Sequence, residues 1–257
     1  MHLLIDIGNS TVVGAIANDN GEIVSTWRFD TIKNQTTDYY IDNLKSGLCA
    51  CGIEPSDIEK TAISSVVPEL NNRFVDAVSK ITGDEPRFFS VIDAERLLDI
   101  DVDFPEQVGK DRLADAIAAA ECYGSPTIVI DMGTATTVGI VTAQRKFVGG
   151  MIIPGVKTSH RALCERASQL SEIDKWEAGS IVGRNTKECM QSGVIFGAAC
   201  MIDGVIDRIN DMFDSPFTIV ATGGMSSVIV PYCKHDIIVD KHLLLKGIYH
   251  AVIAENK

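Results

Sequence analysis

The sequence predicts an α/β protein made of two similar halves, and three observations lead to this fold class. Short apolar stretches alternate with amphipathic segments along the chain, as strands and helices do in α/β proteins. The pattern Ile-Asp-x-Gly-x-x-Thr-x-Val-Gly occurs twice at one constant offset, which takes Asp6 to Asp131. Hydrophobic residues make up 46% of the 257 positions, enough for a sizeable core.

The first half is predicted to run strand, strand, strand, helix, strand, helix. These elements occupy residues 3–5, 12–16, 23–27, 37–51, 62–67 and 68–81. Turn residues at 8–9 and 18–21 separate the three opening strands, which therefore form a meander. Tyr40, Leu44 and Leu48 recur at helical spacing, and Pro68 ends the following strand.

The second half begins after a helix predicted at 111–122, which is rich in Ala and Leu. Strands are predicted at 127–130, at 147–152 and at 217–221, and helices at 157–170, 186–213 and 242–255. We expect two domains, residues 1–115 and 116–257. They would face each other across a cleft, which is where small-molecule sites usually lie.

Composition and charge exclude several classes of protein. The net charge of −12 argues against a broad nucleic-acid surface, because phosphate backbones are bound by clustered Lys and Arg. The start of the chain has no basic segment of a signal peptide, and no apolar run reaches the length of a bilayer span. Seven cysteines without a Cys-x-x-Cys pair predict buried, reduced thiols in a cytoplasmic protein.

The repeated pattern carries chemistry as well as fold. An Asp at a strand end, followed by Gly and hydroxyl residues in a tight turn, offers backbone N–H donors and a carboxylate for a metal-bound water. A single copy is more typical of a plain β-hairpin with an Asx turn. Two copies in a duplicated fold favour a clamp on the phosphates of a nucleotide, with Mg²⁺ neutralising them.

Two further segments add to this pattern. Asp111 is predicted in the first turn of a helix, where the dipole keeps its carboxylate ionised and able to accept a proton from a hydroxyl. A helix cap beside a surface Arg is the alternative. The turn Thr222-Gly223-Gly224 follows an apolar strand, and its glycines permit close approach of a flat ligand such as a base or ribose. The three-part pattern resembles the acetate kinase, sugar kinase, Hsp70 and actin superfamily.

A longer series of motifs makes the resemblance specific, because it is similar in order and spacing to the type III pantothenate kinases. The motifs are Asp6-Ile7-Gly8-Asn9-Ser10, Ser64-Ser65-Val66-Val67-Pro68, Gly109-Lys110-Asp111-Arg112, Asp131-Met132-Gly133-Thr134-Ala135-Thr136, Gly149-Gly150-Met151-Ile152-Ile153-Pro154-Gly155, Gly183-Arg184-Asn185-Thr186, Met190-Gln191-Ser192-Gly193 and Thr222-Gly223-Gly224. This resemblance implies duplicated ribonuclease H-like (actin-like ATPase) domains, each with a mixed five-stranded sheet flanked by helices.

The resemblance also implies an activity. Members of that family phosphorylate the 4′-hydroxyl of pantothenate with ATP, the first step toward coenzyme A. They are typically cytoplasmic homodimers that need Mg²⁺ and a monovalent cation such as K⁺ or NH₄⁺. No contact with nucleic acid or membrane is implied.

Site residues follow from the resemblance position by position. Asp111 matches the general base, and Asp131 matches the ligand of the monovalent cation. Asp6 would hold Mg²⁺ through water. The implied ATP contacts are Asp6, Ile7, Gly8, Asn9, Ser10, Thr11, Val12, Val13 and Thr134. The implied pantothenate contacts are Val102, Gly109, Lys110, Asp111, Arg112 and Thr186, the last reaching the partner subunit's site. Thr186 alternatively caps the long helix that follows.

Three positions depart from the family pattern. Ser10 stands where a Thr is commoner and keeps the hydroxyl, and the other two keep other functions open. Val102 stands where a Tyr is usual, and Lys110 stands where a small residue is usual. Either change could alter the acceptor, so another small-molecule kinase is an alternative. A catalytically silent regulator similar to the Bvg accessory factor is a second alternative, although such a protein has no chemical need to keep Asp6, Asp111 and Asp131.

Overall fold

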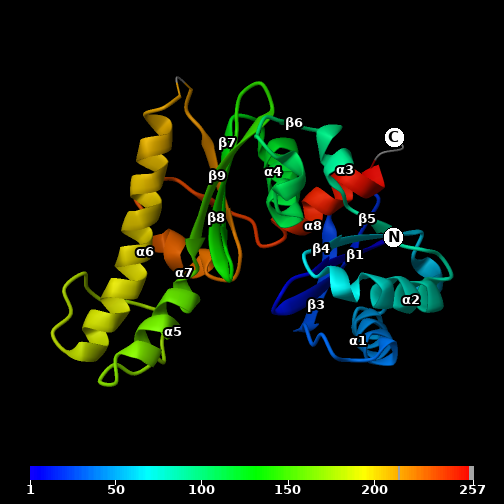
Figure 1. The fold of residues 1–257 in the computed structure, drawn as a ribbon, viewed down its shortest axis with the longest axis horizontal. Helices are drawn as coiled ribbons and strands as arrows, with labels where there is room; N and C mark the ends of the chain where they lie inside the picture. Colours follow the sequence, from blue (N-terminus) through cyan, green and yellow to red (C-terminus); the bar gives the residue numbers. More distant parts are fainter. Residues whose placement is uncertain (214, 255–257) are drawn as a thin grey trace. The chain divides into compact units, whose positions relative to one another are not determined.

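The computed structural model describes residues 1–213 and 215–254, which group into two compact units (Figure 1). The first unit is Met1–Cys122 together with the C-terminal segment from His242, and the second is Tyr123–Lys241. The division expected at residues 115 and 116 falls inside one helix. The last helix, expected in the second half, belongs to the first unit.

The first unit carries a mixed five-stranded sheet in the order β3-β2-β1-β4-β5. Its strands are β1 (His2–Ile7), β2 (Thr11–Ala17), β3 (Ile23–Asp30), β4 (Lys60–Ser65) and β5 (Arg87–Phe88). The opening three strands form the predicted antiparallel meander, whereas β4 runs parallel to β1. The helices are α1 (Thr37–Ala50), α2 (Asn71–Thr82), α3 (Val91–Glu95), α4 (Lys110–Tyr123) and α8 (Leu243–Ile248), with a short strand β6 at Asp99–Ile100.

The two faces of β1 are buried by different helices. Leu3, Ile5 and Ile7 are fully buried on one face, in a core that includes Tyr40 of α1 and Phe74 of α2. Because side chains alternate along a strand, Asp6 lies on the opposite face. On that face α8 contacts β1 and β4, and Figure 1 shows it in red beside the blue strands. The packing of α8 against α4 is so close that a Cβ on Gly247 would overlap the Ala114 carbonyl.

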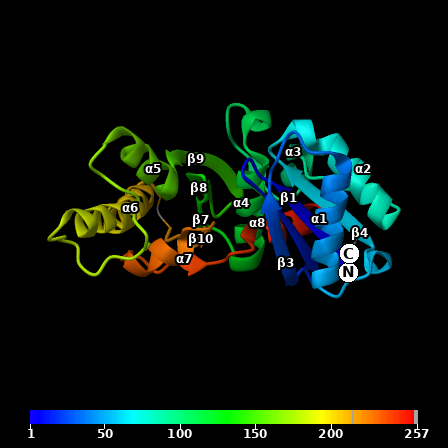
Figure 2. The same cartoon turned by 90° about the horizontal axis from the view of Figure 1, so that it is seen from below.

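The second unit repeats the arrangement. Its strands are β7 (Thr127–Met132), β8 (Ala135–Val141), β9 (Lys146–Pro154), β10 (Thr218–Thr222) and β11 (Ile238–Val239), in the order β11-β10-β7-β8-β9. Its helices are α5 (Val156–Arg166), α6 (Thr186–Asn210) and α7 (Ser226–Ile229), with α5 and α6 side by side (Figure 2). Strand β10 runs parallel to β7, as β4 does to β1.

The two hairpins differ in loop length, so one constant offset cannot align both strands of the first hairpin with those of the second. Gly8 N donates to Thr11 O at 3.1 Å, whereas Gly133 N donates to Ala135 O at 3.0 Å, one residue earlier. The constant offset is therefore right for β1 and β7 but wrong for β2 and β8. Val13 pairs with Asp6, yet Val138 pairs with Ile130 instead of Asp131. A shift of one residue places these two valines on opposite faces of their sheets.

The cysteine prediction is half wrong. All seven are free thiols, as expected. None of them is buried, however, because Cys49, Cys122, Cys189 and Cys200 are exposed and the other three are partly exposed. Helical spacing places Cys189 and Cys200 of α6 away from its buried residues, such as Ile195 and Ile202.

Helix α6 is also long and apolar enough to cross a membrane, which the sequence analysis did not anticipate. Only 33% of its most apolar stretch is buried in the structure. Core helices of soluble proteins meet the same criterion, so length and composition alone are weak evidence of a span.

Candidate active site

The first hairpin loop is tied to the residue that follows the meander. Thr31 Oγ1 donates to Gly8 O at 2.7 Å, and Thr31 N donates to Ser10 O at 3.1 Å. Asn9 and Ser10, at the tip, remain exposed. Thr31 therefore anchors the loop by donating to the carbonyls of Gly8 and Ser10. Sequence reasoning missed this residue, because its only signal is its place directly after the third strand.

The residues expected to contact ATP around this loop have very different surroundings. Ile7 and Val12 are fully buried in the core that includes Tyr40, so their side chains are closed to a ligand. Only their main-chain groups could contact a nucleotide. Asp6 and Val13 pair across the hairpin, share its other face and are partly exposed. Asp6 is thus the ionisable side chain that this hairpin offers to a ligand.

The start of α4 holds Asp111 in a defined position. Its Oδ1 accepts a hydrogen bond from Arg112 N at 2.8 Å. A Cβ on Gly109 would overlap the same oxygen, so only glycine lets the carboxylate fold back over the chain. The first turn of a helix stabilises an ionised carboxylate through the helix dipole. This turn therefore supplies an anionic, partly exposed acceptor for a proton.

Two cationic side chains flank Asp111. Lys110 and Arg112 are both partly buried. Burial lowers the pKa of the Arg112 guanidinium, and the negative charge of Asp111 opposes that shift. Because the reference pKa of Arg is so high, the group remains charged near neutral pH. Val102 lies between β6 and α4, also partly buried, and the nearby Phe104 ring is 60% exposed.

In the second unit, glycines surround the carboxylate of Asp131. Gly223 adopts φ +83°, and a Cβ there would overlap Asp131 Oδ1 and the main chain of Met132. The space at Gly223 is thus filled by the protein itself, in contrast to the expectation that it leaves room for a flat ligand. Around Gly224 the equivalent space is open. A Cβ on Gly133 would lie in ordinary van der Waals contact with both Asp131 oxygens, at 3.4 and 3.5 Å.

The second hairpin loop is anchored by the start of α5. Thr134 O accepts hydrogen bonds from Gly155 N at 3.1 Å and from Thr158 Oγ1 at 2.8 Å. A Cβ on Gly155 would overlap this carbonyl. The Thr134 side chain stays exposed. Thr158 thus plays the part in this loop that Thr31 plays in the first, and sequence reasoning missed it too.

Thr186 is the first residue of α6, but it is not the cap. Asn185 caps the helix, because its Oδ1 accepts from Glu188 N at 3.0 Å. The alternative that Thr186 caps this helix is therefore wrong. Glu188 in turn accepts from Arg184 N and from Asn185 Nδ2, both at 2.8 Å. The Thr186 side chain is exposed and has no part in this network.

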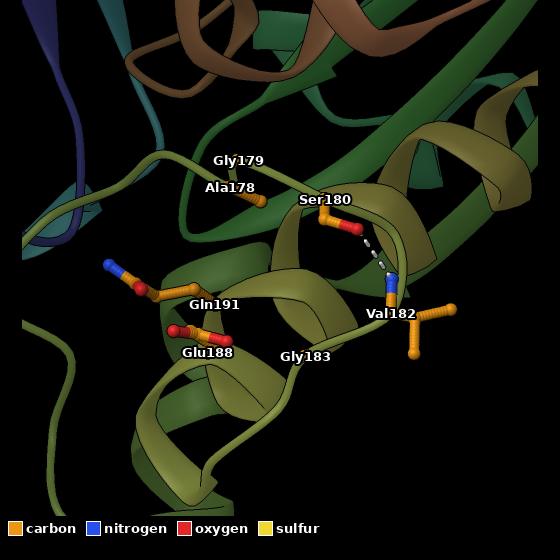
Figure 3. A pocket seen from close by; sticks show the side chains of 7 residues that line it. All are labelled: Ala178, Gly179, Ser180, Val182, Gly183, Glu188 and Gln191. Atoms are coloured by element: carbon orange, nitrogen blue, oxygen red, sulfur yellow. Dashed lines mark hydrogen bonds between the residues drawn. The ribbon is translucent and has the colours of Figure 1, made fainter.

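A hollow of about 290 Å³ lies beside the start of α6 (Figure 3). It is lined by Ala178, Gly179, Ser180, Val182, Gly183, Glu188 and Gln191. Gly183 packs directly against the Cys189 main chain, and Val182 N donates to Ser180 Oγ at 3.2 Å. Gly183 and Gln191 belong to motifs quoted from the sequence, but those motifs did not predict a hollow.

The predicted site residues thus fall into two groups, one in each unit. The first unit contains residues 6–13 on one hairpin, Val102, and residues 109–112 at the start of α4. Asp131, Thr134 and Thr186 belong to the second unit.

Solved structures with the same fold include proteins of different function. A Baf-family transcriptional activator of Campylobacter jejuni superposes with a TM-score of 0.60 at 19% identity, covering 97% of this chain and 96% of its own. A ROK-family glucokinase of Streptomyces griseus, solved with glucose and AMPPNP, superposes with a TM-score of 0.55 at 14% identity, covering 97% of each chain. At these identities the likeness concerns the fold alone.

Sequence relatives are more specific. A type III pantothenate kinase of Halalkalibacterium halodurans is 35% identical over 248 residues, covering 96% of this chain and 97% of the relative. One of Brevibacillus brevis is 37% identical over 253 residues, covering 96% of each. The profile of the type III pantothenate kinase family matches residues 2–208. The chain therefore belongs to the type III pantothenate kinase family.

Proposed function

We infer that this protein transfers the γ-phosphoryl group of ATP to the 4′-hydroxyl of pantothenate, the first step of coenzyme A biosynthesis. The family membership over nearly the whole chain supports this substrate pair. The observation that carries the proposal is the carboxylate of Asp111, held partly exposed at the start of α4.

Asp111 is proposed as the general base. As the acceptor oxygen attacks the γ-phosphorus, its proton passes to the Asp111 carboxylate and ADP departs. Arg112, beside it, provides a cation for the charge that develops on the phosphoryl oxygens. Gly109 leaves room for the folded-back carboxylate and the hydrogen bond from Arg112 N holds it, so the base is oriented before the substrate arrives.

The nucleotide is proposed to bind through the two hairpin loops. Asp6, Thr11, Val13 and the exposed tip at Asn9 and Ser10 would meet the phosphates. Ile7, Gly8 and Val12 would contribute main-chain groups, and Thr134 would contact ATP from the second unit. Oxygen donors at both carboxylates fit hard cations.

Two cations are proposed for these carboxylates. Asp6 would hold Mg²⁺ through water, and that ion would neutralise phosphate charge. Asp131 would hold a monovalent cation such as K⁺ or NH₄⁺. Glycine at 223 leaves room for this carboxylate, because a Cβ there would overlap Asp131 Oδ1.

The acceptor pocket is proposed around Val102, Gly109, Lys110 and Arg112. Val102 offers no hydroxyl where the family usually has a Tyr, and Lys110 adds a positive charge beside the base. These two positions support a different small hydroxyl acceptor as the second candidate function.

We also propose a homodimer in which Thr186 reaches the partner's pantothenate site. Two observations support this assembly. Thr186 is exposed, and only 33% of the most apolar stretch of α6 is buried. Gly193 and Gly197 have open space around them, which would let a second helix approach closely. A cytoplasmic location is proposed as well, and the seven free thiols support it.

The test is ADP release by the purified protein with Mg²⁺ and ATP, with and without pantothenate, in K⁺ and then in Na⁺ buffer. We expect release that depends on pantothenate and is faster in K⁺. Bound ATP with no response to pantothenate in either salt would overturn the proposal and favour another acceptor or a silent regulator. Equal rates in both salts would remove the cation role of Asp131.

A further inference from the structure

A serine lies directly beside Asp6 on the neighbouring strand. Strands β1 and β4 are parallel, and their register pairs Asp6 with Ser64. Paired residues point to the same face of a sheet, and adjacent strands are about 4.8 Å apart. Rotation of the Ser64 hydroxyl about its Cα–Cβ bond can therefore bring it within hydrogen-bond distance of the Asp6 carboxylate.

The Ser64 hydroxyl is buried and unsatisfied. Its side chain has no solvent exposure, and its Oγ has no hydrogen-bond partner among the described residues. The next residue, Ser65, is used differently, because its Oγ accepts from Val67 N at 3.2 Å and supports the turn that follows. A buried hydroxyl without a partner costs stability, and such groups in native proteins call for a reason.

The second unit repeats the same juxtaposition. Strand β10 is parallel to β7, and the register pairs Asp131 with Thr222. Thr222 is also buried, at 5% exposure. The residues before the two hydroxyls differ, Ala62-Ile63 in β4 and Val220-Ala221 in β10. A hydroxyl thus recurs beside each carboxylate although the strands around it have diverged.

We propose that Ser64 and Thr222 are positioning residues, each donating its hydroxyl hydrogen to the neighbouring carboxylate and orienting it toward a cation. The enclosed Ser64 cannot touch a ligand itself, so it acts through Asp6. A carboxylate held by a donor on one oxygen presents its other oxygen in a fixed direction, which lowers the cost of ordering when the cation binds. This inference rests on the proposed roles of Asp6 and Asp131 in holding cations.

The test compares nucleotide binding by Ser64→Ala and by the unchanged protein, with and without Mg²⁺, using calorimetry. We expect roughly tenfold weaker binding of ATP in Mg²⁺, the size of a lost hydrogen bond to a charged group, and no change without Mg²⁺. Ser64→Thr keeps the hydroxyl and should restore most of the affinity. In steady-state kinetics the KM for ATP should rise while the KM for pantothenate stays constant.

Ser79→Ala is the matched control, since Ser79 Oγ in α2 is likewise buried without a partner. Equal effects of Ser64→Ala and Ser79→Ala would refute a positioning role. Asp6→Asn is measured beside them. If neither Ser64→Ala nor Asp6→Asn changes Mg²⁺-dependent ATP binding, the proposed phosphate role of the first hairpin is refuted together with the role of Ser64. If Asp6→Asn weakens binding and Ser64→Ala does not, only the role of Ser64 is refuted.

The second unit gives an independent test should Ser64→Ala fail to fold. Thr222→Val keeps the shape and removes the hydroxyl, and it should raise the K⁺ concentration that gives half-maximal activity and half-maximal thermal stabilisation of the protein. Thr222→Ser should reverse both effects. Thr127→Val is the control, because Thr127 is a buried, unpartnered hydroxyl at the other end of β7. Equal K⁺ requirements for Thr222→Val and Thr127→Val would overturn the pairing of Thr222 with Asp131.

Discussion

Replacing Gly223 by Ala should damage both stability and the monovalent-cation site. Its φ of +83° lies in the left-handed region, where a residue with a Cβ costs about 1–2 kcal/mol. The added methyl group would also overlap Asp131 Oδ1 and the Met132 main chain, and such overpacking costs about 1–3 kcal/mol. The sum is about 2–5 kcal/mol. At about 2–4 °C per kcal/mol for a chain of this size, the Tm should fall by about 4–20 °C.

The neighbouring glycine supplies the control. Gly224 has open space at its Cβ position and no positive φ, so Gly224→Ala should change stability by no more than about 0.5 kcal/mol. Thermal unfolding of both variants by circular dichroism, in K⁺ and in Na⁺, measures the difference. Gly223→Ala should also lose part of the stabilisation by K⁺, since Asp131 must move. Indistinguishable Tm values for the two variants would refute the close packing of Gly223 against Asp131 and Met132.

Three further predictions concern separate parts of the chain. Asp111→Asn should lower kcat by about 10² or more while ATP binding, measured by calorimetry, stays intact; near-normal turnover would remove Asp111 as the base. Asn185→Ala should destabilise the protein by about 1 kcal/mol through loss of the helix cap, whereas Thr186→Ala should not. Denaturant unfolding measures both, and a larger loss of stability in Thr186→Ala would contradict Asn185 as the cap of α6. Burial raises the pKa of Cys233 to about 12, so its thiolate is scarce at pH 8. Alkylation of Cys233 at pH 8, followed by peptide mass spectrometry, should therefore be slower in the folded than in the denatured protein by roughly 10³-fold, and equal labelling rates would contradict that environment.

The sequence predicted the architecture well where one local pattern decides the structure. The meander, the strand that follows the first long helix and the repeat in the second unit all depend on short apolar runs and turn residues. The placement of Asp6 and Asp131 at strand ends follows from the same patterns. Family resemblance then named the residues of the candidate site, as a pattern of spacing cannot do by itself.

Features set by distant contacts were beyond the sequence. Thr31 and Thr158 become loop anchors only when the fold brings them to Gly8 and Thr134. The one-residue difference between the hairpins depends on which carbonyl accepts the glycine N–H. The identical residues at matching positions of the two repeats gave no sign of this difference. At the start of α6, Asn185 and Thr186 are both good caps by residue type, and only the geometry selects Asn185.

The return of α8 to the first unit has a consequence for biosynthesis. In covalent terms the first unit is discontinuous, interrupted by the whole of the second, which occupies Tyr123–Lys241 as a nested insertion. On the ribosome the inserted unit can finish folding while the face of β1 and β4 that α8 covers still lacks its last helix. The first unit is completed only once the segment from His242 has left the ribosome, so a nascent chain stalled before His242 would leave that face open to chaperones and proteases.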